Sequence, residues 1–248
     1  MPFREKRIYS GKYLEIEVYP ITKEERKKSR CKKKKESRKE QKNLNNKNAK
    51  KHLTRLINTN FSEKDIFMTC TYDDINLPSS EEDAKKDINN FIRRIRNYRR
   101  KNNIVELKYI AVIENPVVGK SGKVGRVHHH LVMDGAVERD VVEKLWKKGT
   151  CNTRRLRPSE KGFEDLARYI SKDPKGKRRW TQSKNIRQPD IKINDYKFSR
   201  IKVYELARNI DDGRKIEQMY PGYIFTESFA QVYDLTGTQF YIKMRKLE

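Results

Sequence analysis

The chain has 248 residues, and its 59 lysines and arginines outnumber its 34 aspartates and glutamates, which gives a net charge of +25. No apolar run approaches the ~20 residues that a membrane span requires, and three scattered cysteines form neither a disulfide framework nor a CxxC metal site. The first residues contain no apolar stretch of signal-peptide type, so we expect a cytoplasmic protein without membrane association.

The excess of positive charge favours a polyanionic partner, and nucleic acid is the usual one. Between residues 23 and 52, fifteen Lys and Arg stand against four Glu, a net charge of +11. This stretch has almost no apolar residues, so we expect a polar helix or a disordered arm that contacts phosphates. Its densest part is Lys32, Lys33, Lys34 and Lys35. A solvated segment that only aids solubility is the alternative interpretation.

The predicted elements begin with a short strand at residues 13–19, ahead of the arm. The β-branched and aromatic run at 66–72 predicts a strand, and Ser79 with Glu82 forms a capping box for the helix that follows. Ala84, Ile88, Phe91, Ile92, Ile95 and Tyr98 recur at helical spacing in that helix, which leaves Arg93, Arg94, Arg96, Arg99 and Arg100 for its polar face.

Further along, two strands at 107–114 and 127–133 are expected to pair through a hairpin loop at 115–125. The remaining predictions are helices at 140–148, 162–172 and 201–208, a strand at 151–156, and strand-like runs between 223 and 246. Hairpin-paired strands separated by amphipathic helices predict an α+β fold with a mostly antiparallel sheet.

Three consecutive histidines stand in the strand expected at 127–133. Because side chains alternate along a strand, His128 and His130 project from one face and His129 from the other. Two imidazoles so placed suit a divalent metal, although two polar edge residues give the same pattern. Glu114 ends the preceding strand. If the two strands pair, its carboxylate completes a metal site with positions open for water or substrate, and a solvated strand-end acid is the alternative.

The helix expected at 162–172 carries a candidate nucleophile. Its apolar stripe consists of Phe163, Leu166, Ala167 and Ile170. Tyr169 lies roughly 110° from this stripe, so we do not expect it to serve only as a core residue. A tyrosine hydroxyl attacks only when a metal, a base or a cation assists it. Lys172, three residues later, could balance phosphate charge or move a proton.

A basic and aromatic segment follows this helix. Trp180 stands among Arg178, Arg179 and Lys184, where it could stack on a base while its neighbours hold phosphates. A Trp that anchors a loop to the domain is the alternative.

These segments, in this order, resemble the HUH single-strand DNA endonuclease superfamily, and within it the replication-initiator (Rep) proteins of small phages and plasmids. The matching positions are Phe67, Thr69 and Thr71 in a first motif, His128 and His130 in a second, and Tyr169 and Lys172 in a third. The middle residue of the second motif is His129 rather than an apolar residue, and it is expected to face away from the metal. The resemblance covers about residues 60–190 and is specific in the combination of motifs.

The resemblance implies a ferredoxin-like antiparallel sheet with flanking helices at residues 53–190. Residues 1–52 are then a basic strand and arm, and 191–248 a C-terminal extension that packs on the same domain. It also implies that Mg²⁺ or Mn²⁺ on His128, His130 and Glu114 polarises a phosphate of single-stranded DNA. Tyr169 then attacks, which leaves a 5′-phosphotyrosyl link and a free 3′-hydroxyl. Asp173 is the alternative third ligand.

The implied function is the initiation of rolling-circle replication by nicking and joining single-stranded DNA at an origin. The setting is a bacterial cell or a phage-infected host, with the host helicase and polymerase as partners. An HUH transposase or mobilisation relaxase is the alternative within the superfamily, and such proteins usually differ in the order or number of tyrosines. A non-catalytic basic nucleic-acid-binding protein with an incidental histidine run is the alternative from another class.

Overall fold

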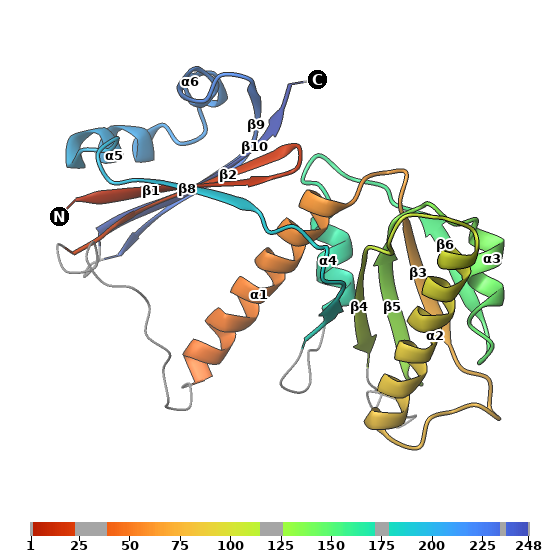
Figure 1. Cartoon of the computed structure of the whole chain (residues 1–248). Helices are drawn as coiled ribbons and strands as arrows, with labels where there is room; N and C mark the ends of the chain where they lie inside the picture. The colour runs from red at the N-terminus through yellow and green to blue at the C-terminus, as the bar shows by residue number, and fades with distance from the viewer. Residues whose placement is uncertain (1, 23–38, 115–125, 172–178, 234–236, 248) are drawn as a thin grey trace. The chain divides into compact units, whose positions relative to one another are not determined.

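The computed structural model describes residues 2–22, 39–114, 126–171, 179–233 and 237–247. The chain divides into two compact units. Unit 1 comprises Met1–Thr59, Ser159–Gly162 and Gln188–Glu248, and unit 2 comprises Asn60–Pro158 and Phe163–Arg187. Each unit contains its own antiparallel five-stranded sheet with helices packed on it (Figure 1). The predicted α+β class with antiparallel pairing is therefore confirmed, although one sheet was expected and two are present.

The sheet of unit 2 has the order β6-β3-β5-β4-β7. Its strands are β3 (Ile66–Thr71), β4 (Tyr109–Glu114), β5 (His128–Met133), β6 (Cys151–Arg155) and β7 (Thr181–Gln182). Its helices are α2 (Glu81–Lys101), α3 (Arg139–Lys144) and α4 (Glu164–Ile170). Apart from β7, each was predicted from local periodicity, with ends that shift by a few residues. The histidine strand β5 is the middle strand.

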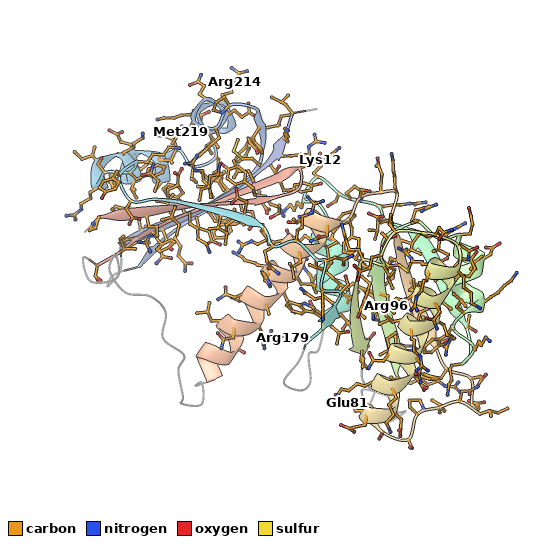
Figure 2. The ribbon with its side chains drawn as sticks, viewed as in Figure 1. Lys12, Glu81, Arg96, Arg179, Arg214 and Met219 are labelled. Carbon is orange, nitrogen blue, oxygen red and sulfur yellow. The ribbon has the colours of Figure 1, made fainter. Side chains whose placement is uncertain are left out.

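Helices α2 and α3 cover one face of this sheet. The apolar stripe of α2 packs there with the inward side chains of β3, β4 and β5, and Val142 and Trp146 complete the cluster from the α3 side. Figure 2 marks Glu81 at the acidic beginning of α2 and Arg96 further along the same helix. The N-cap is Ser80, whose Oγ accepts from the Asp83 amide at 3.1 Å. The predicted capping box is thus off by one residue.

Arg99 is the main departure within α2. It was expected on the polar face, but it is 2% exposed, and its Nη1 lies 3.1 Å from the Asp134 carboxylate. That carboxylate also accepts from the Lys108 amide at 2.7 Å. The ion pair therefore ties the last turn of α2 to the segments that flank β4 and β5, and the aliphatic stem of Arg99 is enclosed with them.

The sheet of unit 1 has the order β8-β1-β2-β10-β9. Its strands are β1 (Phe3–Ser10), β2 (Tyr13–Pro20), β8 (Asp190–Asn194), β9 (Tyr223–Tyr233) and β10 (Gly237–Lys246). Its helices are α1 (Lys39–Asn60), α5 (Arg200–Arg208) and α6 (Gly213–Met219). The sequence predicted β2, α5 and the runs of β9 and β10, but not β1, β8 or α6.

Unit 1 buries side chains on both faces of its sheet. Leu14, Ile16 and Val18 of β2 share a cluster with residues of α5 and α6. On the opposite face, Arg55 of α1 binds the carboxylate of Glu15, with Nη2 to Oε2 at 2.6 Å. The β1–β2 hairpin also requires Gly11, because its φ is +60° and a Cβ there would lie 2.1 Å from the Asn58 carbonyl oxygen.

The two units differ from the expected arrangement of residues 1–52, 53–190 and 191–248. Residues 191–248 supply β10, which pairs with β2, so the two ends of the chain complete the sheet of unit 1. Part of the basic stretch, 39–52, is helical, whereas Lys32, Lys33, Lys34 and Lys35 lie outside the described residues. Within the described part of the chain, no helix is long and apolar enough to cross a membrane.

Candidate functional site

The strand register brings the predicted histidines and acid to one place. β5 runs antiparallel between β3 and β4, so the predicted hairpin pairing of β4 with β5 is confirmed. His130 lies opposite Thr69 on one side and Val112 on the other, and His128 lies opposite Glu114. Because alternate residues of paired strands share a face, these side chains all belong to the face that α2 and α3 leave uncovered.

His130 is held at both ring nitrogens. It is 1% exposed, its Nε2 lies 2.6 Å from Glu114 Oε2, and its Nδ1 lies 3.2 Å from Thr69 Oγ1. A neutral ring that donates from Nε2 to the carboxylate accepts from the threonine hydroxyl at Nδ1. Thr69, a predicted first-motif residue, therefore orients the imidazole, in the way that an outer partner orients a metal-binding histidine.

His129 lies on the other face of the sheet, as the alternation predicted. It is fully buried, its Nε2 is 2.7 Å from the Tyr72 hydroxyl, and its ring packs edge to face against Trp146. Burial, together with the neighbouring His130 and His128, lowers the pKa of His129 to about 3. The ring is therefore neutral at ordinary pH, and its contacts belong to the core between the sheet and α2.

Tyr169 projects from α4 onto the site face. Its ring lies 5.2 Å from the His130 ring, inclined at 66°, and 6.2 Å from the Phe67 ring, inclined at 78°. Phe67 in turn stacks on His130 at 5.8 Å and 15°. Tyr169 is 39% exposed while Ala167 and Ile170 of the same helix are buried, which agrees with its predicted position outside the apolar stripe. Phe67 of the first motif, His130 of the second and Tyr169 of the third thus contact one another.

The described residues contain no group of three or more His, Cys, Asp and Glu side chains placed to hold a metal ion. The pair of His130 and Glu114 nevertheless has suitable donors. Two ligand atoms that each lie ~2.1 Å from an ion, at right angles to each other, are about 3 Å apart. The distance between His130 Nε2 and Glu114 Oε2, 2.6 Å, is only slightly shorter. His128 Nδ1 is buried and has no hydrogen-bond partner among the described residues. These residues fit a hydrated divalent ion that keeps several waters.

Residues 65–174 match the family model of the replication-associated protein ORF2/G2P. The match runs from the residue before β3 to just beyond α4, so it contains the whole cluster around Phe67. It spans less than half of the chain, and it supports a replication initiator protein. No curated protein and no solved structure matches this chain.

The structure describes only some of the other predicted site residues. Lys172, Asp173 and Arg178 lie outside the described residues. Trp180 is half-buried, and its Nε1 donates to Gln182 Oε1 at 3.0 Å, beside the short strand β7. That contact agrees with a loop anchor, and base stacking by Trp180 stays a prediction. Arg179 precedes it at the edge of unit 2 (Figure 2), and Lys184 is exposed.

Arg154 lies at the site but was not predicted from the sequence. This residue of β6 pairs with Phe67 of β3, and its Cζ lies 4.9 Å from the centroid of the Phe67 ring. The alternation of β6 indicates only that Asn152 and Arg154 share a face. Which face they share depends on the register of β6 against β3, and no local pattern in the sequence gives that register.

Proposed function

We propose that this chain is a replication initiator of the HUH superfamily, which cleaves and rejoins single-stranded DNA during rolling-circle replication. The observation that carries the proposal is the meeting of His130, Glu114 and Tyr169 on one face of the sheet of unit 2. The family match over the same segment and the charge of +25 support it, because a strongly basic chain favours a nucleic-acid partner.

Tyr169 is the nucleophile of the proposed cleavage. Its hydroxyl oxygen attacks the phosphorus of one phosphodiester, and the bond from phosphorus to O3′ breaks as the new bond to the tyrosine forms. The phenolic proton leaves and the departing O3′ gains a proton, so the products are a 5′-phosphotyrosine and a free 3′-hydroxyl. Because one phosphoester bond replaces another, a later 3′-hydroxyl can attack the phosphotyrosine and restore both the DNA strand and Tyr169.

A bound Mg²⁺ or Mn²⁺ would polarise the phosphate and neutralise its charge. His130, Glu114 and His128 are the proposed ligands. Thr69 orients the His130 ring, and Phe67 packs against both His130 and Tyr169, which keeps the nucleophile beside the ligand. Lys172, three residues after Tyr169, is proposed to balance phosphate charge or to move the proton.

The proposed substrate is single-stranded DNA at a replication origin, and the proposed setting is the cytoplasm of a bacterial cell or a phage-infected host. A free 3′-hydroxyl primes synthesis, so a host polymerase and helicase are the expected partners. Arg178, Arg179, Trp180 and Lys184 are proposed to hold the strand beside the site through phosphate contacts and stacking.

A pool of single-stranded oligonucleotides, labelled at either end and incubated with the protein and Mn²⁺, tests the proposal. We expect a denaturant-resistant adduct that carries only the 3′-terminal label, and we expect its loss when a chelator is added. A second oligonucleotide with a free 3′-hydroxyl should then release the adduct as a joined product. DNA binding without any adduct would instead favour a non-catalytic binding protein.

A further inference from the structure

The edge of the sheet next to the site carries an arginine that is free to bind an anion. β6 is one of the two edge strands of the unit 2 sheet, and among the strands that the structure describes it pairs only with β3. On this strand Arg154 is exposed and lies over Phe67, and the described residues provide it with no hydrogen bond and no carboxylate partner. Asn152, two residues earlier on the same face, is exposed as well.

The contact with Phe67 leaves the hydrogen-bond donors of Arg154 available. An arginine that packs over an aromatic ring keeps the N–H groups in the guanidinium plane free to donate. The same contact limits the motion of a long side chain, so less conformational entropy is lost when an anion binds. The neighbouring Arg155 differs, because it donates to the Lys64 carbonyl oxygen and alternation places it on the opposite face.

Phe67 packs against both Arg154 and the candidate nucleophile Tyr169. Its ring contacts His130, Tyr169 and the Arg154 guanidinium, so all three lie around one side chain on one face of the sheet. A single strand with one phosphate beside Tyr169 has further phosphates on both sides of it. Arg154 Cζ and the Tyr169 ring lie 4.9 Å and 6.2 Å from the centroid of the Phe67 ring, so a strand that runs from Tyr169 toward β6 can bring one of these phosphates to Arg154.

We propose that Arg154, assisted by Asn152, binds a backbone phosphate next to the phosphodiester that Tyr169 attacks, and so directs the strand across β6. The identity of that phosphodiester rests on the proposed function. The ligand is the phosphodiester backbone and not a base, because a planar guanidinium recognises phosphate oxygens through two parallel hydrogen bonds. Lysine, a point charge, would replace only part of this interaction.

Binding of a labelled single-stranded oligonucleotide to Arg154→Ala, Arg154→Lys and the matched control Arg155→Ala tests this assignment. Each alanine variant removes one positive charge from β6, but only Arg154→Ala removes it from the face of the sheet that carries Phe67 and His130. We expect Arg154→Ala to weaken binding several-fold and to flatten the plot of log K against log salt by about 0.7, the contribution of one phosphate on a single strand. Arg154→Lys should recover part of the affinity, and Arg155→Ala should change it little. Equal losses in the two alanine variants would overturn the assignment.

Adduct formation separates this inference from the proposed function. At subsaturating oligonucleotide, folded Arg154→Ala should form the adduct more slowly than Arg155→Ala, by about the same factor as its loss of affinity. A lower rate with unchanged affinity would overturn the binding role. If wild-type protein forms no adduct, the proposed function fails, while the comparison of binding by the Arg154 and Arg155 variants still decides whether this subsite exists.

Discussion

The ring of Tyr169 meets the ring of His130 edge to face, with centroids 5.2 Å apart and planes inclined at 66°. The tyrosine comes from α4 and the histidine from the middle strand of the sheet. Phe67 touches both rings, so apolar packing helps to hold the two side chains together. Removal of the Tyr169 hydroxyl alone leaves the rings that make this packing.

Tyr169→Phe removes only the hydroxyl and keeps the ring contacts with His130 and Phe67. We expect the covalent adduct to disappear, while the affinity for single-stranded DNA changes by no more than a few-fold. Denaturing gel electrophoresis measures the first quantity and fluorescence anisotropy the second. Tyr196→Phe is the matched control, because Tyr196 is 87% exposed and lies in unit 1. An adduct that persists in Tyr169→Phe and maps to Tyr72 or Tyr98 would refute the assignment.

Glu114→Gln tests the proposed ligand pair with little change in shape. The amide can still contact His130 Nε2, but it lacks the negative charge that attracts a divalent ion. We expect Mn²⁺ affinity, measured by isothermal titration calorimetry without DNA, to fall at least about tenfold, with adduct formation falling in parallel. His130→Ala and His128→Ala should act in the same direction. Undiminished Mn²⁺ binding in all three variants would place the metal elsewhere.

His129→Ala should affect stability and not the chemistry. The substitution opens a cavity beside Trp146 and removes the hydrogen bond to the Tyr72 hydroxyl, so the free energy of unfolding should fall by about 2–4 kcal/mol. Denaturant unfolding measures this loss. Adduct formation per folded molecule should stay near the wild-type value. Wild-type stability with abolished cleavage would show that His129 acts in the site.

Asp134→Ala tests the buried ion pair at the end of α2. Without its partner, Arg99 remains as a buried charge at 2% exposure, and the loss of such a partner costs about 3–5 kcal/mol. Glu81→Ala is the control, since its pair with Lys85 is exposed and should leave the unfolding midpoint near the wild-type value. Similar midpoints for the two variants would show that the Arg99 pair contributes little.

The elements that bear the candidate site were predictable because each has a strong local pattern. Alternation along β5 separates His128 and His130 from His129, and helical spacing in α4 sets Tyr169 apart from its apolar neighbours. The hairpin of β4 and β5 then brings Glu114 beside the histidines, since consecutive strands usually pair. These steps need only the local sequence.

Unit 1 was harder to predict because the hydrogen-bond partners of its buried polar side chains lie far away in the sequence. β1 reads as a charged segment, yet Glu5 is fully buried. Its Oε1 accepts from Lys197 Nζ at 3.0 Å and from the Tyr220 hydroxyl at 2.6 Å. Both partners follow β8, near the other end of the sequence. A local pattern cannot supply these partners, so the sequence predicted no strand at β1, and it placed Arg99 on the polar face of its helix for the same reason.

The basic arm can be tested separately from the folded units. Replacement of residues 23–38 by a neutral glycine–serine linker of equal length removes ten Lys and Arg and three Glu, a net charge of +7. The described elements are left intact, because α1 begins at residue 39 and contacts the sheet of unit 1 through the ion pair of Arg55 with Glu15. A longer deletion would remove part of α1, and circular dichroism should confirm that the helix content persists.

If the arm contacts phosphates, the replacement variant should bind single-stranded DNA more weakly and with a shallower dependence on salt. Each phosphate contact on a single strand contributes about 0.7 to the slope of log K against log salt, so losing four contacts should flatten it by about three. Adduct formation at low salt and saturating oligonucleotide should persist, because His130, Glu114 and Tyr169 all belong to unit 2. An unchanged salt slope in the folded variant would show that residues 23–38 do not bind DNA, and it would favour a role in solubility.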